Sequence, residues 1–208
     1  MPEPALVTTY VVDPVLPWPE VSPELARGPF EAAVMVASGG RHDCAIRKIA
    51  AGGAMLETAA ATALGERIAV ELPNGLRRTA RVDWVGRGEI GIAFDEPVDI
   101  VALINRNLVS QPAERRAMPR VELRATVHVK WAEHLEGGFV RNISSTGIQV
   151  EGAALPPQGT LASLFVEGIN LPPAEAVWRR TGLAGFEFLE EVSWASLIAW
   201  VREASRKA

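Results

Sequence analysis

The chain has 208 residues, of which 48% are hydrophobic and 22% charged, and its formal net charge is −4. This composition suits one large or two small globular domains with a packed core, and the negative charge excludes a global basic field for nucleic acid. The only cysteine, Cys44, rules out an intrachain disulfide and fits a reducing compartment. The first residues lack the pattern of a signal peptide, and no segment has the length of a membrane span. We therefore expect a cytoplasmic protein without membrane insertion.

Residues 1–24 are predicted to be an extended or disordered N-terminus because proline is frequent there. Proline fixes φ and removes a backbone donor, which disfavours helices and central strands. Within this segment, VTTYVV at residues 7–12 has the composition of a short strand.

The rest of the chain contains an internal repeat. RKIAAGGAMLE begins at Arg47 and RNISSTGIQVE begins at Arg141, an offset of 94. Upstream, RGPFEAAVMV matches RVELRATVHV at an offset of 93, which predicts one extra residue in the second copy between Lys130 and Gly138. Two copies are too few for a solenoid. We expect two tandem domains, at 25–108 and 121–208, joined by a linker at 109–120.

Each copy has the pattern of a small antiparallel β-barrel that ends in a helix. Apolar and polar residues alternate from Val121 to Lys130, and further short runs follow between Gly and Pro residues, as in a mainly β fold. Apolar residues then recur at helical spacing near the end of each copy. These stripes are Ile100, Leu103 and Ile104 in the first copy, and Trp194, Leu197, Ile198 and Val201 in the second. Ser193 is the expected N-cap of the last helix.

Two segments of the second copy carry donors and acceptors that suit a guanine nucleotide. Arginine pairs bidentately with phosphate or with the guanine edge, and an asparagine amide offers both a donor and an acceptor. A serine adds a hydroxyl, and a glycine permits a positive φ and a close ligand approach. The segments ERRAMPR and NISSTG supply the candidates Arg115, Arg116, Arg120, Asn142, Ser144 and Gly147. Together they predict a pocket for a phosphate ligand that contains guanine.

The order R-x-x-x-R and then [D/N]-x-S-x-x-G resembles the PilZ domain, a bacterial receptor for cyclic di-GMP. Arg116 to Arg120 match the first part, Arg115 adds the preceding arginine, and Asn142 to Gly147 match the second part. The resemblance covers the whole second copy and implies a six-stranded β-barrel. It also implies that the arginines clamp guanines and phosphates, while Asn142 and Ser144 complete the site. The fold class expected is thus two tandem six-stranded antiparallel PilZ-like barrels, each followed by an α-helix.

The first copy departs from this pattern, so we interpret residues 25–108 as a degenerate PilZ-like barrel without a ligand site. Only the glycine of the second motif persists there. The residues opposite Arg116, Arg120, Asn142, Ser144 and Gly147 are Pro23, Arg27, Lys48, Ala50 and Gly53.

Two functions stay open. The first is a cyclic di-GMP receptor that signals to a protein partner through an inter-domain rearrangement. The alternative is a nucleotide-independent protein-interaction module, in which NISSTG is only a polar turn. His42, Asp43 and Cys44 lie together in sequence, but no second cluster completes a metal site. No catalytic motif occurs in the sequence, so we expect neither an enzyme nor a cofactor other than the ligand.

Overall fold

A computed structural model describes residues 8–12, 30–37, 39–86, 88–110 and 120–207. The chain divides into two compact units, Met1–Pro119 and Arg120–Ala208, called the first and the second unit below. Arg115 and Arg116 lie outside the described residues, as does most of the proline-rich N-terminus. In the described part of the chain, no helix has the length and apolar character that a membrane crossing requires.

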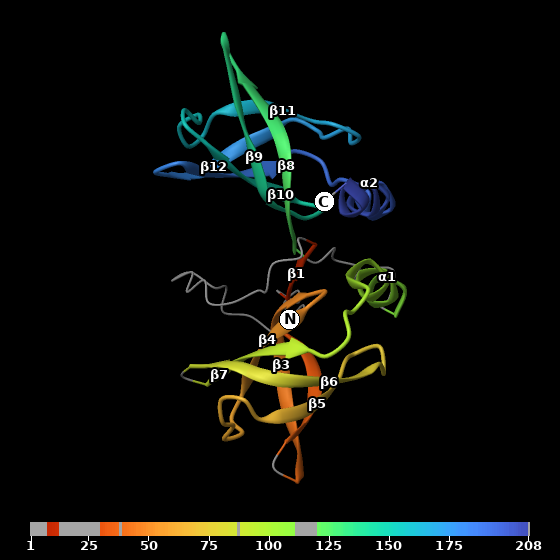
Figure 1. Ribbon diagram of the computed structural model, residues 1–208. Helices are drawn as coiled ribbons and strands as arrows, with labels where there is room; N and C mark the ends of the chain where they lie inside the picture. The colour runs from red at the N-terminus through yellow and green to blue at the C-terminus, as the bar shows by residue number, and fades with distance from the viewer. Residues whose placement is uncertain (1–7, 13–29, 38, 87, 111–119, 208) are drawn as a thin grey trace, which may run out of the picture. The chain divides into compact units, whose positions relative to one another are not determined.

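The first unit contains a closed antiparallel barrel of six strands (Figure 1). The pairings run β2–β3–β4–β7–β6–β5 and return to β2. A helix, α1, follows the last strand. The mainly β fold with a closed six-stranded barrel and a C-terminal helix is thereby confirmed. The strands are β2 (Glu31–Ala37), β3 (Gly40–Ala50), β4 (Gly53–Thr58), β5 (Arg67–Glu71), β6 (Arg77–Val85) and β7 (Glu89–Phe94), and α1 spans Ile100–Ser110.

The barrel forms because every second residue of these strands is apolar and faces the interior. Met35, Leu56, Val70 and Ile92 are fully buried, and each such side chain stabilises the fold by about 1.5–3 kcal/mol relative to exposure. Helix α1 begins at a cap in which Asp99 Oδ1 accepts the Ala102 N–H at 2.9 Å. Its apolar stripe, Ile100, Leu103 and Ile104, is buried as the sequence predicts.

The short strand predicted within residues 7–12 is β1, Thr9–Val11, and it belongs to the first unit. It pairs in parallel with β3, from Thr9 opposite Lys48 to Val11 opposite Ala50. Buried polar contacts hold it: the Tyr10 hydroxyl donates to the Glu31 carboxylate, and Thr8 Oγ1 accepts the Glu31 N–H at 2.8 Å. Burial raises the pKa of Glu31, and the Tyr10 hydrogen bond opposes that shift. The described part of this segment is therefore integral to the unit.

The second unit has six strands whose antiparallel pairings also return to their start. They run β8–β9–β10–β13–β12–β11 and back to β8. Helix α2 follows, and Ser193 caps it as predicted, because Ser193 Oγ accepts the Ser196 N–H at 3.2 Å. The strands are β8 (Arg120–Trp131), β9 (His134–Ile143), β10 (Gly147–Gly152), β11 (Leu161–Val166), β12 (Ala174–Arg180) and β13 (Leu183–Phe188), and α2 spans Trp194–Lys207.

The pairings of the two units correspond at a constant offset of 94. Met35 pairs with Val70 in the first unit, and Val129 pairs with Leu164 in the second. The β2–β3 and β8–β9 hairpins both close over two residues, after Ala37 and after Trp131. The extra residue predicted between Lys130 and Gly138 is therefore wrong. The irregularity of β8 lies further upstream instead, at a register shift between Glu122 and Ala125.

Candidate functional site

The predicted site residues that the structure describes lie where β8 begins and β9 ends. Val121 pairs with Ile143, and both side chains are buried. Because side chains alternate along a strand, Arg120, Asn142 and Ser144 point to the outer face. Arg120, which is exposed, precedes Val121 and so lies beside the end of β9, where Ser144 begins the turn. The fold thus brings Arg120 beside the NISSTG turn.

Asn142 is held by a neighbour that the sequence motif does not include. Its Nδ2 donates to Gln149 Oε1 across the β9–β10 pair at 2.5 Å. This contact fixes the orientation of the Asn142 amide and leaves its carbonyl oxygen directed elsewhere. Gln149 is half-buried and adds a second amide to the outer face. Its position two residues after Gly147, opposite Asn142 in a hairpin, is the signal that could have identified it.

The turn from Ser144 to Gly147 is fixed at both ends. The Ser144 N–H donates to the Gly147 carbonyl at 2.9 Å, while Thr146 O and Ser145 O accept N–H groups of Phe188 and Val192, both at 2.9 Å. Among the described residues, the Ser144 hydroxyl makes only long contacts of 3.4 Å, with Thr146 Oγ1 and the Gly147 carbonyl. Such contacts are weak, so this hydroxyl retains capacity to bind a ligand.

Gly147 is explained by packing rather than by a positive φ. The glycines with positive φ in the described chain do not include it. A Cβ at this position would lie 2.5 Å from the Phe186 carbonyl oxygen, so a side chain would push β10 away from β13. The positive φ expected here is therefore not found. Gly147 lets the turn pack closely on β13, and this need would exist without any ligand.

A polar and aromatic row crosses the outer face beside this turn. In register, Asn142 lies opposite Gln149, Gln149 opposite Gly185, and Gly185 opposite Trp178. The Trp178 ring covers Gly185, because a Cβ there would lie 2.1 Å from Trp178 Nε1. The Arg180 guanidinium lies 5.9 Å from the Trp178 ring centroid. The row places an aromatic side chain and amide groups on one open face.

Arg141 is a further candidate that sequence reasoning missed. It occupies the bulge of β9, where the register shifts between Val140 and Asn142, and it is exposed. Its guanidinium contacts Glu151 Oε2 at 3.3 Å, an exposed ion pair of about 0–1 kcal/mol. A contact this weak is readily exchanged for an anionic ligand. Its place beside Asn142, one residue before the motif, was the available signal.

The equivalent position of the first unit is built differently. Lys48 and Met55 replace Asn142 and Gln149 in the row, which continues to Gly91 and Trp84. β1 pairs with one edge of β3, along Lys48–Ala50. In the second unit, Val121 and Glu122 of β8 pair with the corresponding edge of β9. A separate segment therefore fills the place that β8 occupies in the second unit.

Other candidate chemistry is weak in the described residues. No group of three or more His, Cys, Asp or Glu side chains there could hold a metal ion. Burial raises the pKa of the Cys44 thiol to about 11, and the Asp43 charge adds to the shift. A small cavity in the first unit is lined by Tyr10, Glu31, Ile46, Ile49, Pro73, Asn74 and Leu103. None of the predicted ligand-binding residues is among them.

A family model described as the PilZ domain matches residues 27–109 of the chain. No curated protein matches. The match falls on the first unit, whereas the motifs quoted for the resemblance lie in the second.

Solved structures similar to this chain include three at low identity. The Borreliella burgdorferi PlzA protein in complex with c-di-GMP is 10% identical over 83% of this chain and 86% of its own, with a TM-score of 0.30. The Bacillus subtilis inhibitor of motility, MotI/DgrA, is 16% identical over 87% and 97%, with a TM-score of 0.30. The K. pneumonia MrkH–c-di-GMP complex is 11% identical over 86% and 90%, with a TM-score of 0.31. Scores this low do not by themselves establish a shared fold.

Proposed function

We propose that this chain is a cytoplasmic cyclic di-GMP receptor whose ligand site lies on the second unit. In this proposal the second unit is a second PilZ-like domain, tandem to the one that the family model matches. The chain is a binding protein rather than an enzyme, and it needs no metal.

The observation that carries the proposal is the common orientation of Arg120, Asn142 and Ser144. They come from β8, β9 and the start of the turn and point to one outer face, where Phe188 and Val192 hold the turn in place. Cyclic di-GMP has two phosphates and two guanines, which are recognised by arginine guanidinium groups and side-chain amides that lie close to one another. The outer face offers both, because Arg120 and Arg141 lie beside the Asn142–Gln149 pair.

Arg115 and Arg116 complete the proposed site from residues 109–120. A ligand held between them and the Asn142–Gly147 turn would bring this linker onto the second unit. The two units would then rearrange, and a protein partner would read the change. The ligand can shift such an equilibrium only by its differential affinity for the two arrangements.

A calorimetric titration of the full chain with cyclic di-GMP tests the proposal. We expect saturable binding that weakens as salt is raised, because arginine–phosphate contacts are screened. Arg116→Ala and Arg120→Ala should each weaken binding, whereas Arg124→Ala, within the register shift of β8, should not. Absence of heat at high micromolar nucleotide would contradict the proposed function and leave the interaction module as the alternative.

A further inference from the structure

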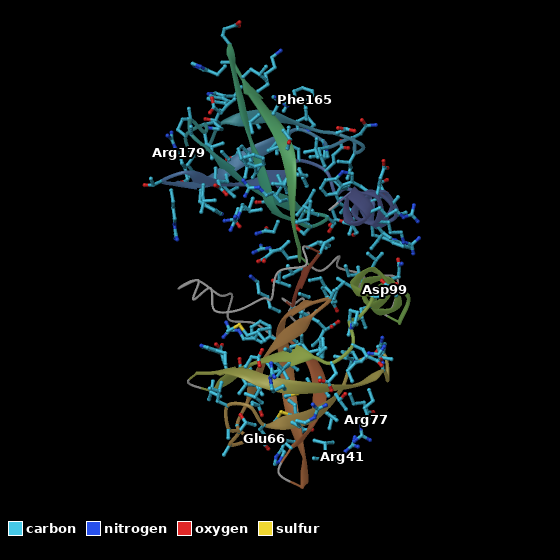
Figure 2. All side chains as sticks on the ribbon, viewed as in Figure 1. Arg41, Glu66, Arg77, Asp99, Phe165 and Arg179 are labelled. Carbon is cyan, nitrogen blue, oxygen red and sulfur yellow. The ribbon has the colours of Figure 1, made fainter. Side chains whose placement is uncertain are left out.

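The second unit exposes four large apolar side chains on one side of its sheet. Leu135 is 65% exposed, Leu161 60%, Phe165 54% and Phe139 39%. Large contiguous apolar surfaces are unusual on monomers and mark interaction sites. Phe165 projects outward from β11 (Figure 2). These four residues are called the apolar face below.

The register shows that the apolar face brackets part of β8. β8 runs between β9 and β11, with Leu135 and Phe139 on β9 and Phe165 on the part of β11 that pairs with β8. Leu161 lies two residues before that part and pairs with Glu175 of β12. Phe139 pairs with Thr126 of β8, and Phe165 pairs with His128. Neighbouring strands lie about 4.8 Å apart, so side chains on the two flanks bracket the same stretch of β8.

The apolar face has one position without a side chain, Gly137, which is called the notch below. This residue sits between Leu135 and Phe139 on β9 and pairs with His128. A Cβ added there would meet nothing within 4 Å, and Gly137 is not among the glycines with positive φ. Neither backbone conformation nor crowding therefore requires glycine. A strand glycine of this kind leaves room for the close approach of another molecule.

Two cations lie in the middle of the same surface. Arg124 and Lys130 are exposed on β8, with the exposed His128 imidazole between them along the strand, and the Arg124 guanidinium lies 4.0 Å from the Phe139 ring centroid. The cations thus run between the apolar residues rather than around them. A binding partner must present both apolar and anionic groups to this surface.

The first unit shows that the fold does not impose such a surface. At the offset of 94, its residues at the positions of Leu135, Leu161 and Phe165 are Arg41, Arg67 and Glu71. Arg41 Nη2 lies 3.1 Å from Glu71 Oε2, and Arg67 Nη2 lies 2.5 Å from Asp95 Oδ2. The same part of the sheet is closed by ion pairs in one unit and left apolar in the other.

We infer that the apolar face is the docking surface for a protein segment that carries an apolar side chain flanked by carboxylates. The apolar side chain enters the notch at Gly137, and the carboxylates pair with Lys130 and accept a hydrogen bond from His128. Charge decides against other occupants. A lipid surface would bury these central cations among acyl chains, whereas membrane-binding faces keep their cations near the headgroups. A second copy, docked by two-fold symmetry, would bring the same positively charged patch onto itself and would supply no carboxylates from that patch.

This inference can be tested by selecting peptides that bind the full chain from a displayed library of random dodecapeptides. The selection contains no nucleotide, so its result does not depend on the proposed function. We expect enriched peptides that combine Asp or Glu with an aromatic or aliphatic residue. Phe165→Glu, which copies Glu71 of the first unit, should weaken their binding at least about tenfold, as loss of a central anchor does. Gly137→Leu, which fills the notch where a Cβ has room, should do the same. The matched control is Leu64→Glu, at a 71% exposed position of the first unit, and it should leave binding unchanged.

Several results would overturn the inference. Enriched peptides that are basic, or that bind Gly137→Leu and Phe165→Glu as well as wild type, would place the docking site elsewhere. Failure to enrich any peptide would also overturn the inference. Dimerisation in analytical ultracentrifugation that Phe165→Glu abolishes would identify a second copy as the occupant. Co-sedimentation with vesicles of phosphatidylcholine and phosphatidylglycerol that Phe165→Glu abolishes would identify a lipid surface.

Discussion

The two units have corresponding strand pairings but carry different chemistry on their outer faces. The first unit matches the PilZ family model, yet it holds Lys48, Met55 and Ala50 where the second unit holds Asn142, Gln149 and Ser144. The second unit has the polar row but lies outside the residues that this family model matches. This difference shows that the buried residues of such a unit and the residues on its outer face can change independently, because the side chains of a strand alternate between the two faces. Resemblance of the barrel and presence of a ligand site are therefore separate questions.

The largest expected effect comes from removing a matched core residue in each unit. Ile143→Ala and Ile49→Ala delete buried side chains at corresponding positions, and each should destabilise its own unit by about 2–5 kcal/mol. We expect Ile143→Ala, below the site, to weaken cyclic di-GMP binding and Ile49→Ala to spare it. Chemical denaturation and calorimetry measure the two effects. Equal loss of binding in both variants would mean that the site depends on both units.

Exchanging the outer residues of the two units should change binding without changing the fold. Asn142→Lys gives the second unit the lysine that the first unit has at this position, Lys48. Arg120→Ala removes the one arginine of the R-x-x-x-R motif that lies in the described residues. Each should cost about 1.5–3 kcal/mol of binding free energy, the range for hydrogen bonds to charged groups. The control Lys48→Asn should have no effect on binding, because β1 fills the flank beside it. A gain of binding in Lys48→Asn would show that β1 does not close that position.

The buried Glu31 should make the stability of the first unit depend on pH. Burial raises its folded pKa above the ordinary value, so the folded state holds the proton more tightly than the unfolded state. Its contribution is fully present below the ordinary pKa and is lost as pH rises through the raised folded pKa. Glu31→Gln should remove this part of the pH dependence, as measured by denaturation at several pH values. A variant whose stability falls with pH as steeply as wild type would contradict the assignment.

Ser144→Ala should have the smallest effect on binding. A neutral hydrogen bond contributes about 0.5–1.5 kcal/mol, and the hydroxyl loses two contacts of 3.4 Å to described residues. Titration should show slightly weaker binding with unchanged thermal stability. A loss as large as that of Arg120→Ala would mean that Ser144 does more than donate one neutral hydrogen bond.

Sequence reasoning predicted the elements whose patterns are local. The alternation from Val121 to Val129, the Ser193 cap and most of the α2 stripe each depend on neighbours within a few residues. In that stripe Leu197, Ile198 and Val201 are buried, whereas Trp194 is 37% exposed, so its predicted place on the buried face is wrong. It failed where long-range contacts decide. The extra residue of the second copy was placed in the hairpin because the alignment matched Arg27 with Arg120 by identity. Only the strand pairing shows that the irregularity lies within β8, between Glu122 and Ala125. Gly147 was attributed to backbone conformation because the approach of the Phe186 carbonyl is visible only in three dimensions.

The candidate site was predictable in its motif residues and not in its surroundings. Arg120, Asn142 and Ser144 follow a spacing that the sequence shows directly. Gln149 and Trp178 join Asn142 only through the cross-strand row, which requires the register of four strands. β1 was predicted as a possible short strand, but its parallel pairing with Lys48–Ala50 has no local signal. Contacts between distant strands therefore account for what the sequence did not predict.

The most direct test of the central claim is a titration of the isotopically labelled full chain with cyclic di-GMP, followed by amide and indole NMR signals. We predict that the nucleotide shifts the signals of Arg120–Glu122, the Arg141–Gly147 segment, Gln149 and the Trp178 indole. The matched signals of Lys48–Gly53 and the Trp84 indole in the first unit should stay in place. Shifts confined to the first unit, or spread equally over both, would contradict a ligand site on the second unit.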